Sequence, residues 1–301
     1  MLEALASFMS FMSFMSFTKS YALLASLLWV SCPQWGLAAT ALKDGIQLKG
    51  TLEQGALLRG HVTPGTKVLL NGEPLKVNSQ GDFAFGFERE APLQHTLTMS
   101  YPDGRSETRE LKIAERQYRI AKVNGISQKI MQPDPQDVAR AAKDSAMVKQ
   151  ARAISSDESG FAEDFIWPLT GRISGVYGSQ RVYNGKPGNP HYGVDVAAKT
   201  GTVVVAPADG VITLAVPDMF YSGGTVIIDH GYGVSSTFLH LSKLYLQPGD
   251  RVKQGQAVAE VGATGRASGP HLDWRINWYQ MRLDAATVVP SMDKVLKKTV
   301  Q

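Results

Sequence analysis

The sequence predicts an all-β protein, with two β domains joined by a short helical linker. Three observations support this class. Short β-rich runs bounded by glycine or proline recur in both halves of the chain. A stretch rich in alanine and charged residues separates the two halves and is predicted to form a helix. Helices do not alternate with the strands, so a parallel α/β sheet is excluded.

Composition narrows the class of protein before any motif is considered. The chain has 301 residues, and 44% of them are hydrophobic, which is enough for buried cores and excludes a wholly disordered chain. Its 31 basic and 27 acidic side chains leave a formal net charge of +4 without the dense Lys/Arg stripe of a nucleic-acid binder. A single cysteine, Cys32, excludes an intrachain disulfide framework and a cysteine-based zinc finger. Because the chain lacks a dense basic stripe, we expect no nucleic-acid partner.

Residues 1–39 have the pattern of a signal peptide. A positive charge precedes the apolar run 21–30, which is too short to cross a membrane as a helix. Small residues end this segment and favour cleavage near Ala39. Lipid attachment at Cys32 is the second interpretation, although Trp29 fits that pattern poorly. The signal pattern predicts export. Because no later apolar stretch reaches membrane length, we expect no transmembrane span in the mature chain.

Residues 40–115 are predicted to form a β-sandwich of the immunoglobulin-like type. The dipeptide Asn71-Gly72 follows an apolar strand and is typical of a type I′ hairpin turn. From Phe83 to Phe87, phenylalanines alternate with small residues, which is the period of a half-buried strand. Other turn signals recur at the intervals of a sandwich. His61 and His95 are isolated in this domain, and we interpret them as ordinary structural or surface histidines.

Residues 116–160 are predicted to form a partly helical linker. Asp134 followed by Pro135 is a helix N-cap with proline at the first helical position, and the helix should continue to Ala153. The simpler interpretation of this segment is an interdomain strut. The other is a segment that covers an active cleft until it is displaced. Residues 161–301 then form the second β domain.

Four of the six histidines lie in this second β domain, and three have informative contexts. His191 and Asp195 flank a glycine and a valine that favour a loop entering a strand, where both side chains can reach one metal ion. His271 and Asp273 share the polar face of a strictly alternating strand. His240 stands alone in an apolar strand, where a satisfied core histidine is the common case.

Several motifs of the second β domain occur together in one known family. The segment from about residue 166 to 290 resembles the lysostaphin-type (LytM-type) zinc endopeptidases, which cut peptide bridges in bacterial cell walls. The matching stretches are Trp167–Gly171, His191–Asp195, Gly201–Ala206, Ala208–Val211, Phe238–Ser242, Gly249–Val252 and Gly262–Gly265 leading to Gly269–Leu272. Their order and spacing agree with the family. The resemblance implies the family's antiparallel β fold, a duplicated hybrid motif.

The resemblance also implies roles for individual residues. His191 and Asp195 match zinc ligands, His271 matches the catalytic histidine, and His240 matches the histidine that polarises water or stabilises the oxyanion. The third zinc ligand of the family is a histidine, and Asp273 takes its place here. Because a carboxylate oxygen is a normal zinc ligand, we expect one Zn²⁺ per chain on His191, Asp195 and Asp273.

Two further expectations follow from the resemblance. Arg275 stands where the family often has an acidic residue, and on the same strand face it would return a positive charge or hold Asp273 in place. Residues 184–189 should be a mobile loop that forms one wall of the cleft. The implied function is hydrolysis of peptidoglycan stem peptides by a zinc-activated water in the periplasm of a Gram-negative cell. Other cell-wall enzymes are candidate partners.

Three other classes of function explain parts of the sequence. A non-catalytic LytM-like regulator would bind and activate a cell-wall amidase; such proteins usually lose several site residues, whereas this chain keeps three and changes one to another ligand type. A lipoyl- or biotinyl-carrier-like domain is suggested by residues 248–256, but Lys253 lacks the flanking methionine of a carrier lysine. A purely structural wall-binding protein leaves the clustered His and Asp residues unexplained.

Overall fold

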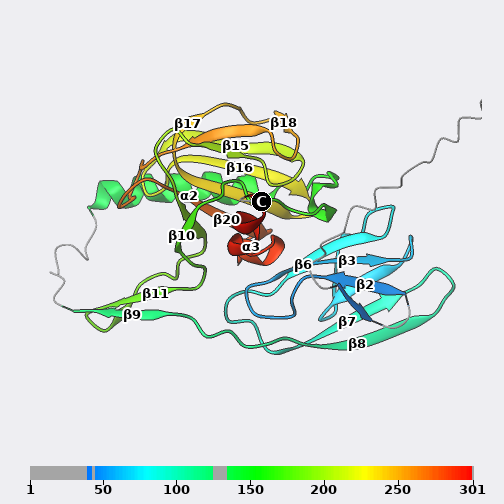
Figure 1. The fold of residues 1–301 in the computed structure, drawn as a ribbon. Coiled ribbons are helices and arrows are strands. Elements are labelled where there is room, and N and C mark those ends of the chain that lie inside the picture. The colour runs from blue at the N-terminus through cyan, green and yellow to red at the C-terminus, as the bar shows by residue number, and fades with distance from the viewer. Residues whose placement is uncertain (1–38, 43–44, 125–133, 300–301) are drawn as a thin grey trace, which may run out of the picture. The chain divides into compact units, whose positions relative to one another are not determined.

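The structure is a computed structural model that describes residues 39–42, 45–124 and 134–299 (Figure 1). These residues all belong to one unit of the chain, Gly36–Gln301. The predicted signal peptide lies outside the described residues apart from Ala39. Among the helices that are described, none has the length and apolar character needed to cross a membrane.

Strands make up most of the described chain, as the sequence predicts for an all-β protein. The strands before the long helix are β1 (Ala39–Leu42), β2 (Ile46–Lys49), β3 (Leu57–Val62), β4 (Lys67–Leu70), β5 (Glu73–Pro74), β6 (Asp82–Gly86), β7 (Gln94–Ser100), β8 (Ser106–Lys112) and β9 (Ile120–Val123). Those after it are β10 (Arg172–Gly175), β11 (Gln180–Tyr183), β12 (Lys186–Pro187), β13 (Val194–Ala197), β14 (Val203–Val205), β15 (Gly210–Met219), β16 (Gly223–Gly231), β17 (Val234–Leu244), β18 (Arg251–Val252), β19 (Ala257–Val261), β20 (His271–Trp278) and β21 (Met281–Leu283). The helical elements are α2 (Pro135–Ala153), α3 (Met292–Thr299) and the 3-10 turns η1 (Gly160–Ala162) and η2 (Ala285–Val288).

Strands β1 to β8 form two four-stranded antiparallel sheets, ordered β1-β2-β3-β6 and β5-β4-β7-β8. Side chains from both sheets, including Leu58, Phe85 and Leu97, are buried in one core. Asn71 and Gly72 have φ of 52° and 85°, as the predicted type I′ turn between β4 and β5 requires. These two sheets therefore form a β-sandwich, and its assignment to the immunoglobulin-like type stays a prediction.

Strand β6 is buried on both faces, whereas its alternating sequence predicts a half-buried strand. Phe83 and Phe85 belong to the sandwich core, but Ala84 belongs to the core built by the later strands. A methyl group added at Gly86 would lie 2.4 Å from Leu283 Cδ1. The small residues of β6 thus let the two cores meet. Alternation cannot distinguish a face that meets water from one that meets a second core through small side chains.

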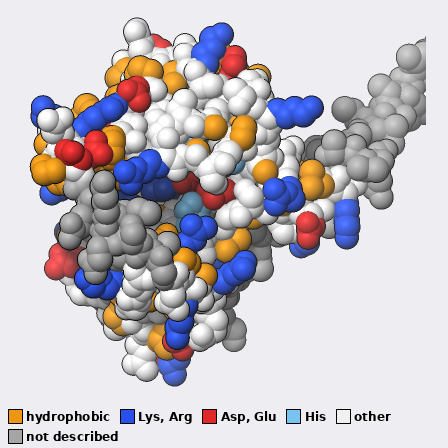
Figure 2. Space-filling view, turned by 90° about the vertical axis from the view of Figure 1, so that its left-hand side faces the viewer, with side chains coloured by type: hydrophobic (Ala, Val, Ile, Leu, Met, Phe, Trp, Pro, Cys, Tyr) orange, Lys and Arg blue, Asp and Glu red, His pale blue; other side chains and the backbone are white. Residues whose placement is uncertain are grey.

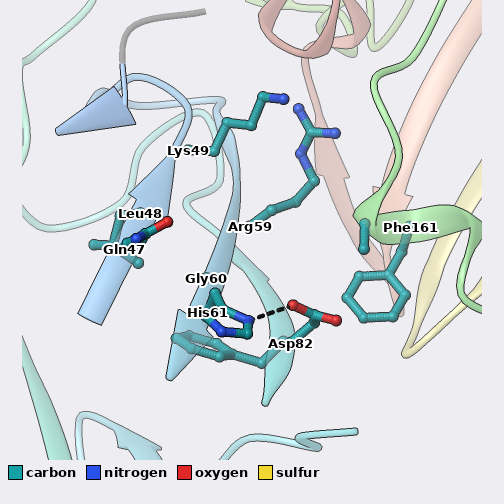
Figure 3. Close-up of a pocket in the computed structure, with 10 residues that line it drawn as sticks. Gln47, Leu48, Lys49, Arg59, Gly60, His61, Asp82 and Phe161 are labelled. Atoms are coloured by element: carbon teal, nitrogen blue, oxygen red, sulfur yellow. Dashed lines mark hydrogen bonds and ion pairs between the residues drawn. The ribbon is translucent and has the colours of Figure 1, made fainter. Parts of the chain in front are cut away.

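A small cavity of about 170 Å³ lies beside this contact, lined by residues of β2, β3, β6 and η1 (Figure 3). At its edge His61 Nδ1 lies 2.7 Å from Asp82 Oδ1. His95 is likewise engaged within the sandwich, because its Nε2 lies 2.7 Å from the Pro92 carbonyl oxygen. His61 thus links β3 to β6, and His95 links β7 to the segment before it, so both have local structural contacts.

The predicted linker helix is observed as α2. The Asp134 side chain caps it by accepting a hydrogen bond of 2.8 Å from the Gln136 backbone N–H. The helix packs on β15 and β16, where Ala151 shares a buried cluster with Leu214. The linker is therefore a docked part of the later β structure rather than a free strut.

A second part of the predicted linker, β9, is a strand. It pairs in parallel with β11, and β11 pairs with β12 in a hairpin that turns at Asn184 and Gly185. Of residues 184–189, expected as a loop, only Lys186 and Pro187 belong to a strand; the others form the hairpin turn and the stretch that follows β12. The linker supplies the third strand, a non-local pairing that local sequence does not reveal.

The strands after α2, apart from β11 and β12, form one ten-stranded sheet with the main order β10-β13-β20-β17-β16-β15-β18. Trp274, Phe238 and Val196 are fully buried in its core. Strand β20 begins and ends where the alternation of its sequence predicts, at His271 and Trp278. The three adjacent strands β13, β20 and β17 in this sheet carry most of the predicted site residues.

Candidate metal and catalytic site

All six residues predicted for the site line one cleft of about 480 Å³. They come from β13, β17, β20 and the loop before β13, and they are His191, Asp195, His240, His271, Asp273 and Arg275. Figure 2 shows histidine surface in a hollow of the molecule, next to acidic side chains and with Lys and Arg side chains nearby. Residues up to 84 positions apart in the sequence are therefore brought together by the pairing of neighbouring strands.

Strand register places two carboxylates side by side. Asp195 on β13 is the direct partner of Asp273 on β20 in the antiparallel ladder. Two glycines provide the space that these carboxylates occupy. A methyl group would lie 2.1 Å from Asp195 Oδ2 if added at Gly175, and 1.8 Å from Asp273 Oδ1 if added at Gly193. The glycine of the His191–Asp195 motif is therefore required by the site itself.

His191 and Asp195 present ligand atoms that lack hydrogen-bond partners. His191 Nε2 and Asp195 Oδ1 lie 3.0 Å apart, and both atoms are buried without a hydrogen bond to a described residue. Burial lowers the pKa of the His191 imidazole, but the carboxylates of Asp195 and Asp273 outweigh this, and the net shift is upward. Buried polar atoms without partners are costly, and a shared cation would satisfy both.

Asp273 is almost fully buried, and Arg275 binds both of its oxygens. The Arg275 Nε donates to Asp273 Oδ1 at 3.0 Å, and its terminal nitrogen donates to Oδ2 at 2.6 Å. Burial raises the pKa of the Asp273 carboxyl, but the guanidinium outweighs burial, so the net shift is downward and the group stays ionised. Arg275 thus lies beside Asp273, on the strand face that the alternating sequence predicts for both.

The three predicted ligand residues fit a divalent metal ion. Ligand atoms of His191, Asp195 and Asp273 all lie within 4.8 Å of one another. One imidazole nitrogen and two carboxylate oxygens are a donor set that zinc accepts. Each carboxylate oxygen has two lone pairs, so Asp273 can bind a metal while it accepts hydrogen bonds from Arg275. These residues could therefore hold the metal.

A bulge in β17 positions His240. The pairing of β16 with β17 shifts register next to this residue, and His240 has φ of 65°, a left-handed conformation that is rare outside glycine. Its Nδ1 lies 2.9 Å from the Thr264 carbonyl oxygen, which can only accept, so Nδ1 carries the hydrogen. Burial lowers the pKa of His240, and the neutral ring has its lone pair on Nε2.

His271 is the first residue of β20, and its ring, like that of His240, has Nδ1 next to a carbonyl oxygen. Its Nδ1 donates to the Gly269 carbonyl oxygen at 2.8 Å, so the neutral ring has its lone pair on Nε2. That Nε2 lies 3.9 Å from Asp195 Oδ1, and the ring centroid lies 4.8 Å from that of His240. The two histidines therefore offer two basic nitrogens beside the candidate metal ligands.

Three arginines at or behind the cleft could not be predicted from the sequence. Arg181 and Arg266 line it, and no motif marks either of them. Arg152, at the end of α2, is buried behind the site, where burial and the charges of Arg282 and Arg275 lower its pKa to about 9. Only their placement by strand pairing and helix docking reveals them.

Comparisons with known proteins agree on one peptidase family for a segment of the chain. The sequence pattern of peptidase family M23 matches residues 189–285. The peptidoglycan DD-endopeptidase ShyA of Vibrio cholerae is 39% identical over 87 residues, which are 29% of this chain and 20% of that protein. The DD-carboxypeptidase/endopeptidase Mpg of Neisseria meningitidis is 41% identical over 100 residues, which are 33% of this chain and 22% of that protein. The chain thus spans about a fifth of the length of these curated relatives.

A solved structure matches most of the chain. A crystal structure described as a putative peptidase M23 from Pseudomonas aeruginosa is 25% identical, with a TM-score of 0.60. The match covers 79% of this chain and 95% of that one. The similarity therefore extends well beyond residues 189–285, into the sandwich or the linker.

Proposed function

Residues 189–285 are a domain of peptidase family M23, and from this premise we propose that the chain is a zinc metalloendopeptidase that hydrolyses peptide cross-links of bacterial peptidoglycan. Several relatives are named as peptidoglycan DD-endopeptidases, and this favours a bond between two D-configured centres, such as D-Ala–diaminopimelate. Action on this polymer requires export, most simply to the periplasm of a Gram-negative cell. We also propose the division into a signal peptide at 1–39, a sandwich at 40–115, a linker at 116–160 and a peptidase domain at 161–301.

The observation that carries the proposal is the pair of unpartnered ligand atoms beside two basic histidines. Apart from their own 3.0 Å contact, His191 Nε2 and Asp195 Oδ1 have no hydrogen-bond partner among the described residues, and Asp273 completes the ligand set. A zinc ion bound there would supply Lewis acidity toward the scissile carbonyl and the attacking water. His271 and His240 lie next to the same position. A site with this set of groups suits amide hydrolysis by water.

The hydrogen bonds of His271 and His240 support different catalytic roles for the two rings. His271 Nε2 faces the ligand residues with a free lone pair, so we assign it the removal of a proton from the attacking water. The neutral His240 ring offers an acceptor at Nε2, and it can donate to an oxyanion there only as an imidazolium. In its neutral form His240 therefore orients the water or a substrate N–H group.

The test is a digest of purified peptidoglycan by the full chain, with the metal content measured beside it. We expect about one zinc per chain, cleavage of cross-linked dimers, loss of cleavage with a chelator and recovery when zinc is returned. Asp195→Ala should strip the metal, since only two protein ligands would remain. Equal zinc in the wild type and in Asp195→Ala would contradict the ligand assignment.

One observation favours the second candidate, a non-catalytic regulator that activates a cell-wall amidase. Arg275 already neutralises Asp273, so this carboxylate has a partner without any metal. Wild type that binds no zinc and leaves dimers intact at every pH, yet accelerates a purified amidase, would support this alternative. Zinc-dependent cleavage would exclude it.

A further inference from the structure

Two arginines that line the cleft, Arg181 and Arg266, have guanidinium groups without an acidic partner among the described residues. Arg181 belongs to β11, and Arg266 belongs to the loop between β19 and β20. Within the described part of the chain, neither guanidinium makes an ion pair or a hydrogen bond. The third arginine of the cleft, Arg275, differs from them because it is committed to Asp273.

The charges of the cleft are unequal. Three guanidinium groups line it together with two carboxylates, and both carboxylates already interact with neighbours: Asp195 with His191, and Asp273 with Arg275. The cleft therefore has one more guanidinium group than carboxylates, and the two guanidinium groups without an acidic partner are those of Arg181 and Arg266. A divalent metal on the ligand residues would increase this excess. A cleft of this kind attracts an acidic ligand.

Arg266 is held in position by aromatic rings. Its guanidinium carbon lies 5.1 Å from the centroid of Phe220 and 4.9 Å from that of Tyr221, and its backbone N–H donates to the Tyr221 carbonyl at 2.9 Å. The linker helix supports this arrangement, because Asp144 of α2 accepts a 2.7 Å hydrogen bond from the Phe220 backbone N–H. Stacking of this kind limits the motion of the side chain and leaves its N–H groups free to bind a carboxylate.

The two arginines lie next to different members of the site. Arg181 is two residues after Ser179, whose carbonyl accepts a 2.8 Å hydrogen bond from the His191 backbone N–H. Arg266 is two residues after Thr264, whose carbonyl binds the His240 ring. Both arginines therefore line the same cleft as the candidate metal and catalytic residues.

We propose that Arg181 and Arg266 are specificity-determining residues that bind carboxylate groups of an acidic peptide substrate. The inference rests on the proposed function for the identity of that substrate, a cross-linked stem peptide, whose free carboxylates would pair with the two guanidinium groups. Arginine suits this task because its planar fork matches a carboxylate in a bidentate arrangement. Amidation of the same carboxylates would remove the charge and half of the acceptors.

The test is calorimetric titration of the full chain carrying His271→Ala, so that the ligand survives. The probes are a cross-linked muropeptide dimer with free carboxylates and the same dimer after amidation. We expect the free dimer to bind at least ~10-fold more tightly than the amidated one. Arg181→Gln and Arg266→Gln should each weaken binding of the free dimer ~3- to 10-fold and change binding of the amidated dimer little. Arg181→Lys should retain part of the preference through its charge.

The matched control is Arg172→Gln, which removes the same charge from an exposed arginine of β10 that does not line the cleft. It should leave both affinities unchanged. Equal binding of the two dimers, no binding of either, or equal losses for both dimers in the Arg181 and Arg266 variants would overturn the proposal. Because the readout is binding, absence of hydrolysis in the wild type would count against the proposed function alone.

Discussion

Asp195 and Asp273 face each other directly across the ladder of β13 and β20, so the sheet places two carboxylates at one point. Like charges in opposed positions destabilise a strand pair. The chain offsets this repulsion with Arg275, which binds both oxygens of Asp273, and with His191, which lies against Asp195. In the lysostaphin-type pattern the third ligand is a neutral histidine. We therefore interpret Arg275 as the compensation for the charge that Asp273 adds.

The first prediction concerns this compensation. Arg275→Gln should destabilise the metal-free protein by about 3 kcal/mol, because a buried carboxylate loses its partner opposite another carboxylate. Zinc should restore more stability to this variant than to the wild type, since the cation replaces the missing positive charge. Urea unfolding with chelator and with zinc measures both effects. Arg275→Lys is the control that keeps the charge, and equal zinc stabilisation of Arg275→Gln and the wild type would contradict the interpretation.

The second prediction separates the base from the ligands. His271→Ala should keep about the same zinc content as the wild type and lose hydrolysis of cross-linked dimers. The reason is that the His271 ring is anchored through Nδ1 to Gly269, while its Nε2 stands 3.9 Å from Asp195 Oδ1, outside the ligand group. Elemental analysis and muropeptide chromatography on the same sample measure the two effects. If zinc leaves with the imidazole, His271 is a ligand and the assignment of Asp273 falls.

A third prediction uses the left-handed backbone at His240. Every non-glycine residue without a local hydrogen bond is strained at φ of 65°, so His240→Ala should be less stable than His240→Gly by about 1 kcal/mol. Both variants should slow hydrolysis by roughly 10²-fold, because both remove the imidazole. Denaturant unfolding ranks the stabilities. Equal or reversed stabilities would show that the bulge relaxes when the ring is lost.

The local parts of the site could be predicted from the sequence. Alternation fixes the bounds of β20 and its two faces, and the spacing of His191 and Asp195 indicates a loop that enters a strand. These features depend only on side-chain periodicity and on glycine, so they can be derived without knowledge of the fold. Which neighbour faces Asp273 depends on the register between strands, and no local pattern specifies that register.

The remaining features of the site come from contacts between distant segments. The bulge that turns His240 appears only when β16 and β17 are paired. Arg266 becomes part of the cleft because its loop packs against Phe220 and Tyr221, more than 40 residues earlier. The burial of β6 on both faces has the same origin, since Ala84 meets a core that is formed by another part of the chain. Such residues carry no periodicity signal of their own.

The last prediction concerns His230, which is fully buried in β16 and lies away from the cleft. Its Nδ1 lies 2.7 Å from the Asp209 carbonyl oxygen, and its Nε2 lies 2.8 Å from Ser236 Oγ. Burial lowers its pKa to about 4, against about 6.5 in the unfolded chain. Between these values the unfolded chain binds the extra proton, so stability falls as the pH falls from about 6.5 to about 4.

This single histidine should account for up to about 3 kcal/mol of the acid destabilisation. His230→Gln keeps a polar group in the same place and does not titrate, so it is the matched comparison. Urea unfolding of both proteins at several pH values gives the test. The wild type should lose its advantage over His230→Gln progressively between about pH 6.5 and about pH 4, and the difference should be constant above pH 7. A difference that does not change with pH would show that His230 keeps an ordinary pKa in the folded protein.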